Sequence, residues 1–154
     1  MRALQLVEDR KLVEVDLPPP PPPGLGEVTV RIAKVALNHI DVWGWRGMAF
    51  AKRKMPLVIG AEAAGRVDTV GPGVSGLKQG QLVSIFGAQT CGLCGPCQGG
   101  RANLCENVAG VHGFHLDGFA QELINLPARN LVPAPPGVDE TGAALAPITF
   151  GTVE

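Results

Sequence analysis

Residues 91–105 read CGLCGPCQGGRANLC, and this stretch holds all four cysteines of the chain. In the spacing C-x2-C-x2-C-x7-C, tight turns aim neighbouring thiolates at one point and a longer loop returns the last, which is typical of a tetrahedral zinc site. The glycines between the cysteines permit the positive φ values that wrapping around an ion requires. Cys91, Cys94, Cys97 and Cys105 would fill every zinc position, leaving none for water or substrate. The stretch therefore predicts one structural zinc.

Two other uses of the four cysteines remain open. Disulfide bonds need an oxidising compartment, yet the N-terminal stretch MRALQLVEDRKLVEV has acidic residues where a signal peptide needs an apolar run. Bacterial ferredoxins share the C-x2-C-x2-C pattern, but their fourth cysteine follows after three residues and precedes proline. Cys105 instead follows after seven residues and precedes Glu106. Zinc fits the spacing better than either alternative.

The composition is that of one ordinary domain. The chain has 154 residues, of which 45% are hydrophobic and 18% charged, and its formal net charge is -1. Such a balance lacks the basic footprint of a protein that binds nucleic acid or an anionic membrane. No apolar run reaches the roughly 18 residues of a membrane span. We expect a cytoplasmic protein with neither nucleic acid nor membrane as a partner.

Short strands dominate the sequence pattern. Several segments alternate polar and apolar residues, as half-buried strands do. The chain also has 21 glycines and 14 prolines, more than a helical bundle tolerates. The run Pro18–Pro23 is favoured as an extended connector over a recognition ligand. The fold class is therefore mainly β, a partly open barrel with short helices and a four-cysteine lobe at about 88–112. The expected strands cover residues 12–15, 28–35, 65–70, 82–86 and 119–125.

Two short helices are expected. Asn38 can cap a helix that runs to Trp45 and ends at Gly47, and Asp139 can cap a second before a helix-favouring alanine pair. Residues 71–76 spell GPGVSG, a literal G-x-G-x-x-G. A dinucleotide fingerprint needs a helix after it, but the next strand leaves no room for one, so we expect a turn.

These residues together resemble the N-terminal, GroES-like catalytic domain of the medium-chain dehydrogenase/reductase family. The resemblance implies a GroES-like fold for residues 1–154, with the lobe's zinc as the family's structural zinc. It also implies that a Rossmann coenzyme domain is absent from this chain, which would be inactive alone. The parent enzyme would use NAD(P)H and form a homo-oligomer. The resemblance is carried by ALNHIDVW at 36–43, GAEAAG at 60–65, VGPGV at 70–74, the cysteine lobe, GFAQ at 118–121 and residues 143–152.

The zinc alcohol dehydrogenases of this family also hold a catalytic zinc, and this sequence departs from them. By resemblance, their three ligands match Asn38, Ala61 and a position at or near Ile148. A catalytic zinc needs three protein ligands and an open position, and these side chains do not supply them. The pattern resembles instead the zinc-independent quinone oxidoreductases and enone reductases, whose substrates are quinones and activated double bonds.

The resemblance assigns candidate roles to five residues. Asn38 would donate an amide hydrogen bond to the substrate oxygen, and Asp41 would orient its segment or a water. Glu62 would be a buried pocket carboxylate that needs a partner other than metal. Thr152 would lie against the nicotinamide, and His39 near the coenzyme phosphates. As ordinary structure, Asn38 would be a helix cap, Asp41 and Thr152 helix residues, and His39 a surface histidine.

Two other functions remain open. A zinc-dependent dehydrogenase acting on an alcohol or aldehyde would need unconventional ligands such as His39, Asp41 and Glu62. A stand-alone zinc-stabilised β module would instead bind a partner through an exposed apolar face. We further expect His112 and His115 to be exposed loop residues and the segment 143–150 to be exposed.

Overall fold

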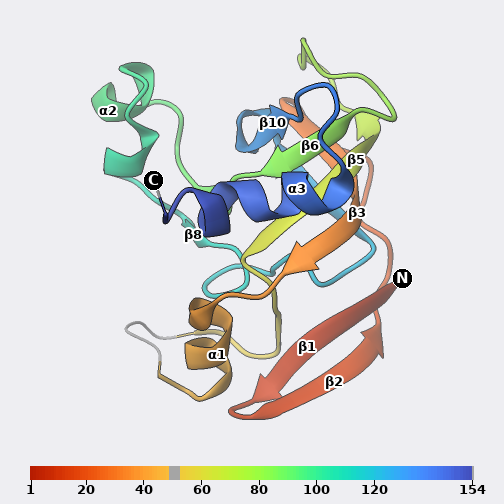
Figure 1. The fold of residues 1–154 in the computed structure, drawn as a ribbon, viewed down its shortest axis with the longest axis vertical. Coiled ribbons are helices and arrows are strands. Elements are labelled where there is room, and N and C mark those ends of the chain that lie inside the picture. Colours follow the sequence, from red (N-terminus) through yellow and green to blue (C-terminus); the bar gives the residue numbers. More distant parts are fainter. Residues whose placement is uncertain (49–52, 154) are drawn as a thin grey trace.

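The computed structural model describes residues 1–48 and 53–153, and most of its regular structure is antiparallel β-sheet (Figure 1). The largest sheet has the order β10-β6-β5-β3-β9, and a smaller one has the order β2-β1-β4. A bridge between Ala3 and Gln121 links the two sheets without closing them into a full barrel. The expected mainly β, partly open fold is confirmed. The strands are β1 (Arg2–Glu8), β2 (Lys11–Asp16), β3 (Glu27–Ala36), β4 (Leu57–Val58), β5 (Glu62–Val70), β6 (Leu82–Ile85), β7 (Ala88–Gln89), β8 (Gly110–Val111), β9 (Leu123–Pro127) and β10 (Leu131–Pro133).

Short helical elements lie between and after these strands. The segments η1 and η2 are 3-10 turns, and η3 is a single π-helical turn that directly continues α3. The elements are α1 (His39–Trp45), α2 (Gly95–Gln98), η1 (Ala102–Leu104), η2 (Ala128–Asn130), α3 (Glu140–Leu145) and η3 (Ala146–Phe150). No helix among the described residues is long and apolar enough to cross a membrane.

The main core lies on one face of the five-stranded sheet. Because successive side chains in a strand point to opposite faces, every second residue of β3, β5 and β6 turns inward. Ile124 and Leu126 of β9, paired with Val30 and Val28, extend the same apolar face, and Phe119 packs against it. Each such aliphatic or aromatic side chain contributes about 1.5–3 kcal/mol on burial. The buried members are Val28, Val30, Ala63, Val67, Val83, Ile85, Phe119, Ile124, Leu126 and Leu131.

The alternate residues of β5 face α3, which lies across the other side of this sheet (Figure 1). Ala64 packs against Ala143 and Ala144, and the Arg66 side chain donates to Glu140 at 3.0 Å. The expectation that the whole 143–150 segment is exposed is therefore wrong, since Ala143 and Ala144 are buried. The small side chain at position 64 lets the helix approach the sheet closely. The same alternation turns Glu62 toward the chain that follows α3.

Both helix predictions are confirmed. Asn38 is the N-cap of α1, and the Asp41 carboxylate accepts its backbone N–H at 2.8 Å. Gly47, with φ +77°, follows the helix in a conformation that other residues rarely adopt. Asp139 caps α3 by accepting the Gly142 N–H at 2.7 Å.

The turn prediction at 71–76 is also confirmed, because the segment leads into β6 with no helix between. The proline run forms the loop between β2 and β3. The strand expected at 119–125 begins only at Leu123. Phe119 and Ala120 instead donate their N–H groups to Gly60 and Ile59, at 2.9 Å each, so that segment crosses beside β4. The sequence patterns did not indicate strand β1.

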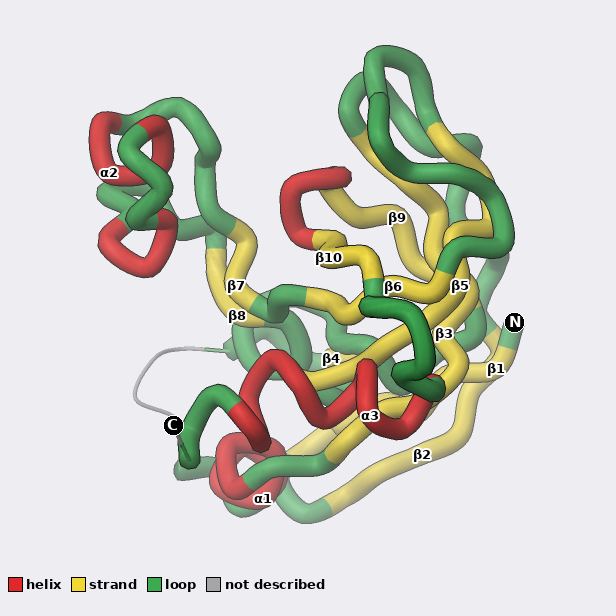
Figure 2. The backbone as a smooth tube through the Cα atoms, turned by 45° about the horizontal axis from the view of Figure 1, so that its top comes forward, coloured by secondary structure: helices red, strands yellow, loops and turns green. Residues whose placement is uncertain are grey.

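The four-cysteine lobe projects from the sheets on a narrow stem. Strands β7 and β8 pair antiparallel, with Ala88 opposite Val111, and everything between them belongs to the lobe. Figure 2 shows α2 and the neighbouring loops set to one side of the sheets, connected through these two short strands.

Candidate functional site

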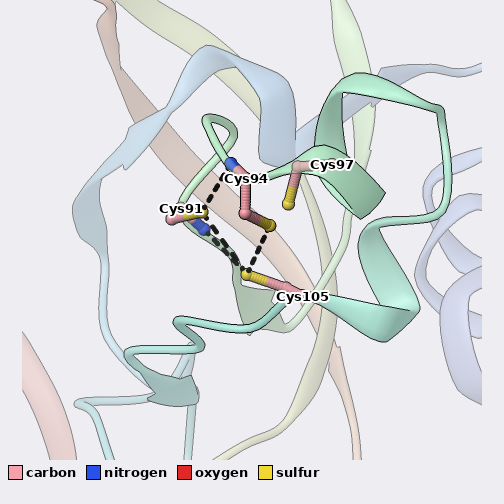
Figure 3. Close-up of side chains that lie close together, drawn as sticks. All are labelled: Cys91, Cys94, Cys97 and Cys105. Atoms are coloured by element: carbon pink, nitrogen blue, oxygen red, sulfur yellow. Dashed lines mark hydrogen bonds between the residues drawn. The ribbon is translucent and has the colours of Figure 1, made fainter.

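The sulfur atoms of Cys91, Cys94, Cys97 and Cys105 converge within the lobe (Figure 3). All four lie within 4.8 Å of one another. The Cys105 sulfur is 3.6 Å from that of Cys91 and 3.9 Å from that of Cys94. A tetrahedral zinc with Zn–S bonds of about 2.3 Å places its sulfurs about 3.8 Å apart. The donor set and its spacing therefore fit a tetrahedral metal, and none of the four cysteines is in a disulfide.

Backbone N–H groups point at two of the sulfurs. Leu93 and Cys94 donate to the Cys91 sulfur at 3.4 Å, while Cys91 and Asn107 donate to the Cys105 sulfur at 3.3 and 3.4 Å. Such donors stabilise negative charge on sulfur. The N–H groups of Leu93 and Cys94 lower the pKa of Cys91 to about 6.

The fourth thiol shows why the cluster suits a cation. Burial, together with the hydrogen bonds that its thiol donates to the neighbouring cysteine sulfurs, raises the pKa of Cys97 to about 12. Four thiolates cannot share so small a volume without a positive charge among them. A metal ion supplies that charge and removes the thiol protons outright.

The 3-10 turn η2 holds the stem of the lobe, a contact that sequence patterns did not indicate. Asn130 is buried, and its amide donates to the carbonyls of Phe86 and Ala88 at 2.8 and 3.0 Å. Arg129 donates twice to the carbonyl of Thr90, the residue before the first cysteine.

Glu62 is the centre of a second cluster, far along the chain from the cysteines. Its side chain is completely buried and accepts four hydrogen bonds. The N–H groups of Ile148 and Thr149 reach Oε1 at 2.7 and 2.9 Å. The Asn38 amide and the Thr149 hydroxyl reach Oε2 at 2.8 Å each. Both carboxylate oxygens are thus satisfied by neutral donors from α1 and η3.

These donors keep Glu62 ionised. Burial alone raises the pKa of a carboxyl group, but the hydrogen bonds from Asn38, Thr149 and Ile148 together outweigh it, and the pKa of Glu62 lies below its usual value. The partner that a buried Glu62 was expected to need is this set of donors.

Asn38 and Asp41 lie at the first turn of α1. Asp41 holds the backbone of Asn38, whose side chain reaches Glu62. Burial raises the pKa of Asp41, against the opposing effect of backbone N–H groups, that of Asn38 foremost. Asp41 Oδ1 is buried and makes no hydrogen bond of good geometry with the residues that the structure describes.

His39 and Thr152 lie outside the Glu62 cluster. His39 is exposed, and its ring lies 6.1 Å from that of Trp43 on the same helix. Thr152 is exposed, and its hydroxyl donates to the Ile148 carbonyl at 2.6 Å. Of the five residues singled out besides the cysteines, the structure brings together Asn38, Asp41 and Glu62.

The residues at the Glu62 cluster do not fit a catalytic metal. The three matching positions carry an amide that donates to Glu62, a methyl group and an isoleucine whose N–H donates to Glu62. Within residues 1–48 and 53–153, the cysteines form the one group of three or more Cys, His, Asp or Glu side chains spaced to hold a metal ion. His39, Asp41 and Glu62, the unconventional ligand set, form no such group.

The expectation for the two histidines after the lobe is half wrong. His115 is exposed, but His112 is 5% exposed and packs against Phe119 with ring centroids 5.1 Å apart. Its Nδ1 lies 2.7 Å from the carbonyl oxygen of Asp117, and burial lowers the pKa of His112. His112 is therefore a neutral core histidine, held by the turn that returns the chain from the lobe to the sheet.

Thr149 is the functional candidate that sequence reasoning missed. It supplies two of the four hydrogen bonds to Glu62. The available signal was the buried carboxylate itself, because a buried Glu without metal requires donors. Thr149 follows Ile148, the position matched with a metal ligand, and could therefore supply such donors.

Comparison with known proteins gives a consistent picture. Residues 24–136 match the family described as the alcohol dehydrogenase GroES-like domain. L-threonine 3-dehydrogenase of Xanthomonas oryzae pv. oryzae is 36% identical over 146 residues, covering 94% of this chain and 43% of that protein. The same enzyme from Pyrococcus horikoshii is 34% identical over 137 residues, covering 88% and 38%.

Solved structures agree with the sequence relatives. An NAD-dependent alcohol dehydrogenase superimposes with a TM-score of 0.87 at 41% identity, covering 97% of this chain and 44% of that one. A thermostable alcohol dehydrogenase from Pyrobaculum aerophilum gives a TM-score of 0.80 at 34% identity, covering 96% and 44%. The chain thus spans less than half the length of these relatives. It belongs to the alcohol dehydrogenase GroES-like domain family, the N-terminal part of the medium-chain dehydrogenases.

Proposed function

We propose that this chain is the catalytic domain of an NAD(P)-dependent medium-chain oxidoreductase and forms one side of its active-site cleft. It would hold one structural zinc in the lobe and no metal at the Glu62 cluster. Residues 1–154 would be the GroES-like domain, with the lobe at about 88–112. The coenzyme domain would lie outside this chain. The chain by itself would then be inactive, because the cleft for hydride transfer lies between two domains.

The observation that carries this proposal is the complete hydrogen bonding of Glu62. Its two oxygens accept from two backbone N–H groups, one amide and one hydroxyl, at 2.7 to 2.9 Å. A carboxylate that supports a metal site needs a cationic neighbour, whereas this one is stabilised by neutral donors. The cluster is thus complete without an ion.

Asn38 is the residue that would contact substrate. A side-chain amide has two N–H donors, and Glu62 takes one of them at 2.8 Å, which fixes the orientation of the amide. The second N–H would donate to the oxygen on which negative charge develops. Asp41 would hold the Asn38 backbone in place. The nicotinamide, when bound, supplies the hydride, with Thr152 beside it and His39 near the coenzyme phosphates.

The first candidate reaction is reduction of a quinone or an enone, because a donor to the developing oxygen suffices for it without a Lewis acid. In this proposal the parent enzyme is a cytoplasmic homo-oligomer acting on a small molecule.

A second candidate, oxidation of an alcohol or reduction of an aldehyde, is favoured by a different observation. The relatives named above are threonine and alcohol dehydrogenases, and their names give no support to quinones or enones over alcohols. A third reading, a stand-alone zinc-stabilised β module, gains nothing from relatives that are dehydrogenases.

The two reactions can be separated with the polypeptide that carries this chain together with its coenzyme domain. Turnover of NADPH and NADH would be measured with a quinone, an enone and an aldehyde, before and after incubation with 1,10-phenanthroline. Quinone or enone reduction that resists the chelator supports the first candidate. Aldehyde reduction abolished by the chelator, while the lobe keeps its metal, supports the second and contradicts the metal-free cluster.

A further inference from the structure

We infer that Arg129 is a positioning residue for the metal lobe, holding the turn that presents Cys91 to the ion. Arg129 lies in η2, between β9 and β10, and so belongs to the sheet side of the stem. Its Nε and Nη2 both donate to the carbonyl oxygen of Thr90, at 3.1 and 2.7 Å. When two N–H groups of one guanidinium, here called the guanidinium fork, donate to the same carbonyl oxygen, they fix both the position and the direction of that carbonyl.

Arg129 also packs against the residue on the other side of Cys91. A Cβ atom added to Gly92 would lie 3.2 Å from both Cδ and Nε of Arg129, so the side chain is in close contact with the glycine backbone. Gly92 has φ +72°, and its carbonyl accepts from the Gln98 amide at 2.7 Å. Cys91 is thus bracketed by Arg129 through Thr90 before it and Gly92 after it.

The bracketed turn supplies the hydrogen bonds that the Cys91 sulfur receives. The N–H groups of Leu93 and Cys94 reach that sulfur at 3.4 Å only while the backbone of this turn keeps its shape. Partners outside the ligands themselves commonly change metal affinity 10- to 100-fold. A zinc bound by four thiolates also carries a net charge of about -2, which favours a guanidinium hydrogen-bonded to Thr90, the residue before a ligand.

Arg129 differs from its neighbour Asn130, which also contacts the stem. Asn130 is buried and braces the carbonyls of Phe86 and Ala88, so its loss affects the sheet. Arg129 lies at the surface, and among the described residues its side chain donates only to Thr90, at the entry to the lobe. Its replacement should therefore change metal retention with little change in the unfolding of the barrel.

This inference rests on the metal site proposed above, and it is tested with Arg129→Met, Arg129→Lys and a matched control. Arg101→Met removes the same charge and length from the lobe itself, where the Arg101 side chain is exposed and makes no hydrogen bond or ion pair with the described residues. Zinc affinity would be measured on the 154-residue chain by competition with a chromophoric chelator. The rate of zinc transfer to the chelator and the cobalt-thiolate absorption after Co²⁺ replacement would be recorded as well.

We expect Arg129→Met to weaken zinc binding about 10-fold or more and to speed its release, while Arg101→Met stays within about 2-fold of wild type. Arg129→Lys keeps the charge but not the fork, so it should recover only part of the loss. The cobalt spectrum should keep its four-thiolate bands, and the thermal midpoint of the barrel should be unchanged. Retention by Arg129→Met equal to wild type, or full recovery by lysine, would overturn the role given to the fork. A wild-type chain that binds no zinc would instead refute the metal site itself.

Discussion

The lobe and the Glu62 cluster solve the same electrostatic problem in opposite ways. In the lobe, four thiols crowd within 4.8 Å, and the few N–H donors near them cannot balance four negative charges. At Glu62, one carboxylate receives four neutral donors at 2.7 to 2.9 Å, and these donors stabilise its single negative charge. The comparison teaches that a buried anion can be stabilised by a cation or by converging donors, and that the ratio of donors to charge separates the two cases.

The difference follows from where the donors come from. The lobe is a loop on a two-strand stem, and its four backbone N–H donors reach only the Cys91 and Cys105 sulfurs among the four thiols. Glu62 lies at the start of β5, under the π-helical turn η3, whose unpaired N–H groups point at the carboxylate. Helical turns leave their first N–H groups free for such acceptors.

Cys105→Ser should have the largest effect, because it removes a ligand from the region that depends on a cation. Zinc binding to small zinc peptides has an apparent free energy of about 10 to 16 kcal/mol, which is coupled to folding. We expect affinity to fall by more than the 10- to 100-fold typical of outer contacts, and residues 88–112 to become protease-sensitive.

Limited proteolysis and metal content check this. Leu104→Ser introduces the same side chain one residue earlier, at a position that is 55% exposed, and should behave as wild type. A Cys105→Ser lobe that resists protease and keeps its zinc would contradict the account of the lobe.

Glu62→Gln should have the next largest effect, because the new amide N–H group must face a donor. The substitution removes one charged hydrogen-bond acceptor. It also places the new amide N–H group opposite one of the N–H or O–H groups that donate to Glu62 in this buried site. We expect a loss of about 2–4 kcal/mol in the free energy of unfolding, measured by urea denaturation, with metal content unchanged.

Glu14→Gln provides the matched control, since Glu14 is exposed on β2 and makes no ion pair or side-chain hydrogen bond with the described residues. It should be neutral within about 0.5 kcal/mol. Equal stability of the two variants would mean that the donors around Glu62 contribute nothing.

A pH titration sharpens the same comparison. The pKa of Glu62 is lowered in the folded state, so its stabilisation is complete above the ordinary value of 4.5 and is lost as the pH falls through the folded pKa. The stability difference between wild type and Glu62→Gln should be constant above about pH 5 and shrink below about pH 4.5.

Asp41 changes the stability in the opposite direction. Its pKa is raised in the folded state, so its ionisation lowers the free energy of unfolding as the pH rises. It is present in both proteins, so it cancels from the difference. A difference that grows on acidification would show that the pKa of Glu62 is raised in the folded chain.

Asp139→Ala should have the smallest effect, since it touches neither cluster directly. It removes the side chain that accepts the Gly142 N–H at 2.7 Å and caps α3. Loss of such a cap lowers stability by about 1 kcal/mol. Thermal unfolding measures this, with Asp139→Asn, which retains the acceptor, as the control. Zinc loss on this substitution would show that the two regions are coupled through α3.

Local patterns predicted much of this molecule. The cysteine spacing indicated the lobe, alternation indicated β3, β6 and most of β5 but not β1, and Asn38 and Asp139 marked the starts of α1 and α3. Each of these signals lies within a few neighbouring residues. The turn at 71–76 was also predictable, because the distance to the next strand leaves no space for a helix.

Long-range contacts were not predictable from such patterns. Three of the four donors to Glu62 belong to Ile148 and Thr149, which lie 86 and 87 positions later in the chain, and the packing of α3 on β5 brings them there. The burial of His112 depends on Phe119 and on the carbonyl of Asp117, which meet through the returning chain. The clamp of Arg129 on Thr90 spans 39 positions and has no local signature.

The most direct test is the number of metal ions per chain. Protein purified without added zinc would be analysed by inductively coupled plasma mass spectrometry, alongside Cys105→Ser and Glu62→Gln. The account predicts about one zinc in wild type and Glu62→Gln and almost none in Cys105→Ser. About two zinc ions per wild-type chain, with one lost in Glu62→Gln, would contradict it and show that the Glu62 cluster holds metal.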